Sequence, residues 1–183
     1  MSESQTLYIF ITGPQGAGKS SLLASLGGDD DFFIDHELGI EYRLFDIDDS
    51  LQLCVIAPVD GSRFESLMEI DPRDLLGYIL VVDSTDPDSW ALAQMMLKTC
   101  RGYALLPTLV AANKQDSPRA HKPERLGEVV GMDSMMQILG LVAVQRPSAR
   151  ELFLKLLYTV EHEMEMLDIL IARIEDLLGS QGS

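Results

Sequence analysis

The residues best suited to chemistry stand between Gly13 and Ser20, where the chain reads Gly-Pro-Gln-Gly-Ala-Gly-Lys-Ser. This segment fits the pattern G-x-x-x-x-G-K-[ST], in which glycines let the backbone N–H groups surround phosphate groups. Lys19 would neutralise the β and γ oxygens, and the Ser20 hydroxyl would bind Mg²⁺. A glycine-rich turn without a ligand is the alternative. The residues expected to contact the phosphates are Gly13, Gln15, Gly16, Ala17, Gly18, Lys19, Ser20 and Ser21.

A second polar motif, Asn113-Lys114-Gln115-Asp116, follows an apolar run in the form N-K-x-D. Together with the phosphate loop, it resembles the Ras-like small GTPase superfamily. The resemblance implies that Asp116 accepts hydrogen bonds from guanine, while Asn113 and Lys114 brace the base and the loop. Adenine lacks these donors, so Asp116 would select GTP and GDP. A polar turn that caps the strand is the alternative, and an adenine-nucleotide kinase would leave this motif unexplained.

The elements that must position these motifs alternate between strands and helices, which predicts an α/β fold with a mostly parallel sheet. A hairpin at residues 48–50 adds one antiparallel edge strand. The expected strands are 7–12, 38–47, 51–57, 75–83, 107–113 and 138–144, and the expected helices are 19–26, 87–100, 123–130 and 148–178. The resemblance makes this six-stranded arrangement the three-layer P-loop NTPase fold of a Ras-like G domain.

The family's last base-contacting loop has no clear counterpart, and the best positional candidates are Ala143 and Val144. The segment 81–86 resembles the equivalent strand end in Arf-like members. The whole chain, 1–183, is expected to form one G domain, with 166–178 as a helical extension and 179–183 as a flexible tail. The extended last helix carries an apolar seam from Leu157 to Leu178, which is either a core-facing stripe or a surface for self-association.

The family's second metal and catalysis motif corresponds here to residues 57–64. This alignment places Ala57 where a metal-binding carboxylate is expected and Gly61 where a water-positioning glutamine is expected. Asp60 would be the metal ligand if the alignment shifts. Arg63 is either an arginine finger in cis or a surface ion-pair residue.

In the family, a loop called the first switch supplies a threonine that closes on Mg²⁺ and the γ-phosphate. This chain has no threonine between Thr12 and Thr85. The loop from Gly28 to Leu38 is acidic instead, and it is either a solvated loop or a source of a substitute metal ligand. Gln15 would lie beside the γ-phosphate, where it crowds the attacking water or orients it. The catalytic candidates are therefore Lys19, Gln15 and Arg63.

The composition limits the kinds of partner that the chain is expected to bind. The formal net charge of −15 disfavours nucleic acid and an anionic bilayer. The chain ends show no lipidation motif, so no direct membrane anchor is expected. Cys54 and Cys100 lack metal-ligand spacing and are expected to be reduced thiols in the cytoplasm. The expected partner is a regulatory or effector protein.

Two functions follow from these observations. The first is a slow GTPase switch, similar to MglA-type GTPases, that needs a roadblock-type partner for hydrolysis. The second is a catalytically inactive pseudo-GTPase, in which the nucleotide stabilises a protein-interaction module.

Overall fold

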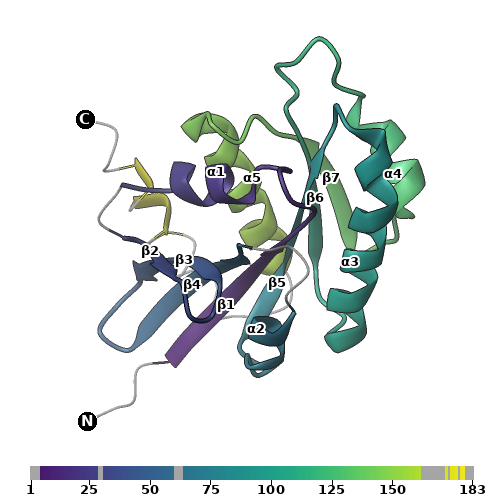
Figure 1. The fold of residues 1–183 in the computed structure, drawn as a ribbon. Helices are drawn as coiled ribbons and strands as arrows, with labels where there is room; N and C mark the ends of the chain where they lie inside the picture. The colour runs from purple at the N-terminus through teal and green to yellow at the C-terminus, as the bar shows by residue number, and fades with distance from the viewer. Residues whose placement is uncertain are drawn as a thin grey trace.

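The computed structural model describes residues 5–28, 31–59, 64–161, 172, 174–176 and 178–179. Figure 1 shows a twisted sheet between two layers of helices. The strands are β1 (Gln5–Thr12), β2 (Phe32–Asp35), β3 (Ile40–Asp46), β4 (Leu51–Pro58), β5 (Leu75–Asp83), β6 (Thr108–Asn113) and β7 (Met136–Gly140). The helices are α1 (Lys19–Ser25), α2 (Glu65–Met68), the short 3₁₀ helix η1 (Pro87–Ser89), α3 (Trp90–Tyr103), α4 (Pro123–Val130) and α5 (Arg146–Glu161). Within these ranges, no helix is both long enough and apolar enough to cross a bilayer.

The sheet has the order β2-β3-β4-β1-β5-β6-β7. Strands β4, β1, β5, β6 and β7 pair in parallel, whereas β3 runs antiparallel to both β2 and β4. The predicted α/β class is confirmed, with seven strands instead of the six expected. The additional strand is β2, which lies in the segment assigned to a loop. Phe33 stacks on Tyr42 of β3 with ring centroids 5.2 Å apart, and such aromatic cross-strand pairs stabilise a sheet edge.

Helices cover both faces of the central strands, which explains their continuous apolar runs. On one face, Ile9 and Ile11 of β1 pack in the main core with residues of α1 and α5, including Phe153. On the other face, Leu80 and Val82 of β5 pack with residues of α3 and α4. Because these strands are parallel, their carboxyl ends lie at one edge of the sheet, where the loops that follow β1, β5 and β6 meet.

The C-terminal part differs from the single long helix that the sequence predicted. Helix α5 is described as far as Glu161, and Ile174 is fully buried in the main core. The Tyr158 hydroxyl donates a hydrogen bond to the carboxylate of Glu175. In one straight helix these two residues would lie about 25 Å apart, because each residue adds about 1.5 Å. An uninterrupted helix from Ser148 to Leu178 is therefore wrong.

The apolar seam of that predicted helix is used inside the domain wherever the structure describes it. Leu157, Val160 and Ile174 are buried in the main core, and Leu178 packs against it. Burial of apolar area is favourable in itself, so these residues need no second protein to cover them. The rest of the predicted long helix and tail, at 162–171, 173, 177 and 180–183, lies outside the described residues.

Arg43 connects the sheet to the end of α1 through a side chain that is only 1% exposed. Its Nε donates to the Leu23 carbonyl at 3.0 Å, its Nη2 to that of Ala24 at 3.3 Å and its Nη1 to that of Gly28 at 2.7 Å. Carbonyl groups at a helix C-terminus carry partial negative charge, which compensates the buried cation. Arg43 thereby fixes the end of α1 and the chain as far as Gly28.

Candidate nucleotide-binding site

The loop between β1 and α1 adopts a conformation that requires glycine. Gly13, Gly16 and Gly18 have φ values of 140°, 77° and 106°. A Cβ atom on Gly13 would lie 2.1 Å from the Val81 carbonyl oxygen, and one on Gly18 would lie 2.2 Å from Nδ2 of Asn113. Gly16 instead has nothing within 4 Å of that position, so the loop opens outward there. The glycines predicted to shape a phosphate loop therefore do shape a tight, outward-opening turn.

Lys19 lies inside this turn and is 6% exposed. Its Nζ donates to the carbonyl oxygens of Gly13 at 2.9 Å and Pro14 at 3.1 Å. Gln15 is exposed on the loop, while Ser20 is exposed and Ser21 half-buried on the first turn of α1. The arrangement holds a positive charge within the loop while exposing the serine hydroxyl predicted to bind a metal ion.

The buried side chain of Asn113, at the end of β6, joins the two motifs. Its Nδ2 donates to the Ala17 carbonyl at 2.8 Å, and its Oδ1 accepts from the Ala143 backbone N–H at 2.9 Å. One amide thus connects the phosphate loop, the N-K-x-D segment and the loop after β7. Along the chain, Asn113 lies 96 positions from Ala17 and 30 positions from Ala143.

A cavity of about 180 Å³ lies beside Asn113. It is lined by Gly18, Ser21, Asn113, Lys114, Asp116, Val142, Ala143 and Val144. All of these except Val142 were predicted from the sequence as nucleotide contacts. Val142 lies next to the two predicted residues of its loop, and its N–H donates to Oγ of Ser148 at 3.0 Å. A pocket with one exposed carboxylate, Asp116, and apolar walls can accept a planar base whose edge donates hydrogen bonds.

Asp83, at the end of β5, is a site residue that the sequence analysis did not single out. Its Oδ2 accepts a 2.5 Å hydrogen bond from Nζ of Lys114, and its Oδ1 accepts from the Thr85 N–H and hydroxyl. Burial raises the pKa of Asp83, but the hydrogen bonds from Lys114 and Thr85 outweigh it and keep the pKa below its ordinary value. Asp83 is therefore a carboxylate that holds Lys114, which itself has a left-handed backbone at φ 66°.

The catalytic side of the predicted site is only partly described. Asp60, Gly61 and Arg63 lie outside the described residues. Ala57 is fully buried in the main core, where an acidic side chain was expected in the family pattern. Within the described ranges, no three His, Cys, Asp or Glu side chains form a metal-binding cluster.

In the acidic segment before β3, the described residue Asp35 forms hydrogen bonds within the backbone turn. Asp35 Oδ1 accepts hydrogen bonds from the N–H groups of Glu37 and Leu38, both at 2.9 Å. Such Asx turns stabilise tight connections between antiparallel strands. Asp35 therefore stabilises the turn between β2 and β3.

Comparison with known proteins supports this fold. Neither a protein-family model nor a curated protein matches the chain. A solved structure of the Arl6 BBS3 small GTPase from Trypanosoma brucei, with bound nucleotide analogue GppNp, is similar with a TM-score of 0.67. The match covers 87% of this chain and 100% of that one, at 19% sequence identity. The expected Ras-like small GTPase fold is therefore confirmed, and at this identity the likeness concerns the fold alone.

Proposed function

We propose that this protein binds GTP and GDP with Mg²⁺ and acts as a slow molecular switch that needs a partner protein for hydrolysis. The observation that carries the proposal is the position of Asn113. Its amide connects the phosphate loop to the segment at Ala143, and Asp116 lines the same pocket as Gly18. A base in that pocket would lie directly next to the loop that receives its phosphates. The likeness to a nucleotide-bound small GTPase supports the same conclusion.

The residues present fit a nucleotide better than they fit a protein-held metal. Lys19 supplies positive charge within the loop, and the exposed Ser20 supplies one oxygen ligand. Mg²⁺ commonly keeps several waters and uses few protein ligands together with substrate phosphates. In this proposal Mg²⁺ neutralises charge on the phosphates, while Asn113 and Lys114 orient the base and Asp116 selects it.

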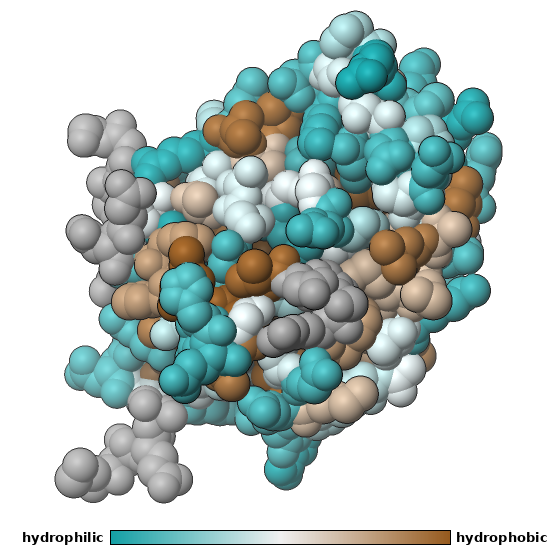
Figure 2. Space-filling model, viewed as in Figure 1, coloured by the Kyte–Doolittle hydropathy of each residue, from teal (hydrophilic) through white to brown (hydrophobic). Residues whose placement is uncertain are grey.

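A second candidate is a nucleotide-stabilised interaction module without hydrolysis. Two observations favour it: Ala57 provides no carboxylate, and apolar side chains border an open hollow on one face of the sheet. This hollow, a cavity of about 400 Å³, includes Tyr8, Leu38, Tyr42 and Leu44 among its lining residues. Figure 2 shows apolar residues at the surface around β2 to β4. Exposed apolar area of this kind is typical of protein interfaces, and a roadblock-type or other regulatory protein is the proposed partner.

A cytoplasmic location belongs to the same proposal. Cys54 and Cys100 are both free and buried. Burial raises the pKa of each thiol to about 12, which keeps both in the unreactive protonated form. These cysteines therefore behave as core residues and need no oxidising compartment.

The substitution Asp116→Asn tests guanine recognition. We expect GDP affinity to fall roughly 10²-fold or more, because two charge-assisted hydrogen bonds worth about 1.5–3 kcal/mol each are weakened or lost. Fluorescent-nucleotide titration measures the change, and chromatography of nucleotide released from the denatured wild type identifies the natural ligand. Asp88→Asn, an exposed carboxylate in η1, is the matched control. Unchanged GDP affinity in Asp116→Asn would refute the proposed selector.

Hydrolysis separates the two candidate functions. We expect purified protein given GTP to form GDP slowly over a day, only with Mg²⁺, because the described residues offer no water-positioning side chain beyond Gln15. Chromatography of the nucleotide over time measures the rate. GTP that stays bound and intact, with and without Mg²⁺, would instead support the interaction module.

A further inference from the structure

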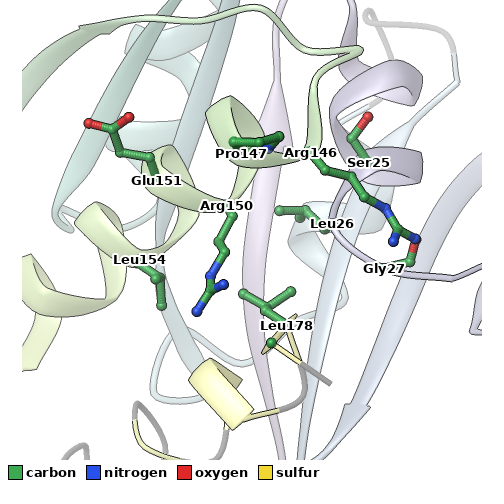
Figure 3. Close-up of a pocket in the computed structure, with 10 residues that line it drawn as sticks. Ser25, Leu26, Gly27, Arg146, Pro147, Arg150, Glu151, Leu154 and Leu178 are labelled. Atoms are coloured by element: carbon green, nitrogen blue, oxygen red, sulfur yellow. The ribbon is translucent and has the colours of Figure 1, made fainter. Parts of the chain in front are cut away.

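A cavity of about 520 Å³ lies away from the nucleotide-binding pocket, with which it shares no lining residue. It lies between the end of α1, the first turns of α5 and the C-terminal residues 178–179 (Figure 3). Its lining residues are Ser25, Leu26, Gly27, Arg146, Pro147, Arg150, Glu151, Leu154, Leu178 and Gly179. A volume of this size falls within the range of small-molecule sites.

The walls of the cavity are apolar and anchored. Leu26 is 2% exposed and belongs to the main core, and Leu154 and Leu178 are partly buried against that core. The wall that contains Leu178 is held by the buried Ile174 and by the hydrogen bond of Glu175 with Tyr158. An apolar group of a bound ligand would therefore pack against a wall that is already attached to the domain.

Two arginines give the cavity a positive charge. Arg146 Nη2 donates to the Gly27 carbonyl at 2.7 Å, which fixes one guanidinium at the rim. In Figure 3 the Arg150 guanidinium extends into the space between Leu154 and Leu178, whereas the Glu151 carboxylate points away from it. Within the described ranges, Arg150 makes no ion pair or hydrogen bond through its side chain.

This combination is unusual for the chain as a whole, which has 29 acidic and 14 basic side chains. A guanidinium next to apolar walls recognises a ligand that has a carboxylate at one end and an apolar body, because Arg binds carboxylates through two parallel hydrogen bonds. The net charge of −15 disfavours an anion at long range, so a carboxylate would be held here by short-range contact with the guanidinium.

We propose that this cavity binds a small carboxylate amphiphile, with its head group on Arg150 and its apolar body against Leu26, Leu154 and Leu178. The site is independent of the proposed nucleotide-binding function. The ligand class is defined by an acid group, by an unbranched or compact apolar body and by a size that fits about 520 Å³.

Octanoate is the probe for the test, and octan-1-ol and octylamine are its neutral and cationic counterparts. NMR titration of the full chain with ¹³C-labelled leucine methyl groups reports binding next to Leu154 and Leu178. We expect saturable shifts of these methyl groups with octanoate and at least about tenfold weaker binding of the two counterparts.

The variant Arg150→Gln is expected to lower octanoate affinity about tenfold while leaving octan-1-ol binding unchanged, which also shows that the cavity is still formed. Arg150→Lys should keep part of the affinity, and Arg73→Gln, an exposed arginine paired with Asp71, is the control that should change nothing. Absence of saturable octanoate binding, equal binding of octanoate and octan-1-ol, or unchanged affinity in Arg150→Gln would each overturn the proposal. Binding of a glutamate-rich peptide in place of octanoate would overturn it in favour of a protein-docking surface.

Discussion

Replacing Lys19 with alanine is expected to lower the affinity for GTP and GDP by roughly 10²- to 10⁴-fold. The Nζ atom is nearly buried inside the loop, which places its charge where the phosphates would lie. Hydrogen bonds that involve a charged group contribute about 1.5–3 kcal/mol each, and each 1.4 kcal/mol is a factor of ten in affinity. Loss of two such bonds to phosphate oxygens gives the expected range. Titration with a fluorescent GDP analogue measures it.

Lys19→Ala should also lower the free energy of unfolding of the nucleotide-free protein slightly. The carbonyl groups of Gly13 and Pro14 each lose a donor, although water can replace it on an open loop. Lys98→Ala, on the exposed face of α3, is the control for removal of a lysine elsewhere. If Lys19→Ala keeps GDP affinity within threefold of the wild type while folding normally, the loop is a glycine-rich turn and the proposed nucleotide site is wrong.

The sequence predicted the parts of the site that depend on local rules. Gly13, Gly16 and Gly18 were expected to let the backbone turn tightly, and all three have positive φ angles. The N-K-x-D segment was expected at the end of a buried strand, and Asn113 is the last residue of β6. The family resemblance implied that Asn113 braces the phosphate loop, and its amide does donate to the Ala17 carbonyl.

Contacts between segments that are distant along the chain could not be predicted from the sequence pattern. Asp83 has the appearance of an ordinary strand end, and only its register opposite Asn113 in the neighbouring strand brings it to Lys114. The heptad-like spacing from Leu157 to Leu178 predicts one helix, but period alone cannot show that Glu175 contacts Tyr158. Ile174 is buried in the main core of the same domain, and tertiary packing of this kind overrides a local pattern.

Removing the Asn113 side chain is expected to lower stability and nucleotide affinity together. In Asn113→Ala, the Ala17 carbonyl and the Ala143 N–H would both lose their partner in a buried position. Each unsatisfied buried group costs about 1–3 kcal/mol, so the free energy of unfolding should fall by about 2–6 kcal/mol. A typical domain has only about 5–15 kcal/mol in total, which makes this a large fraction. Thermal and urea unfolding of the nucleotide-free protein measure the loss.

The second effect of Asn113→Ala distinguishes a shared scaffold from a simple core residue. The phosphate loop and the loop at Ala143 would no longer be tied, so GDP affinity should fall even at a temperature where the variant stays folded. Gln137→Ala is the matched control, because it removes an amide from β7 that donates to the Thr159 hydroxyl at 3.0 Å, remote from the pocket. This variant should lose some stability and keep its GDP affinity. If Asn113→Ala lowers the unfolding temperature while folded protein binds GDP as tightly as the wild type, the amide only stabilises the fold, and the two loops do not act as one site.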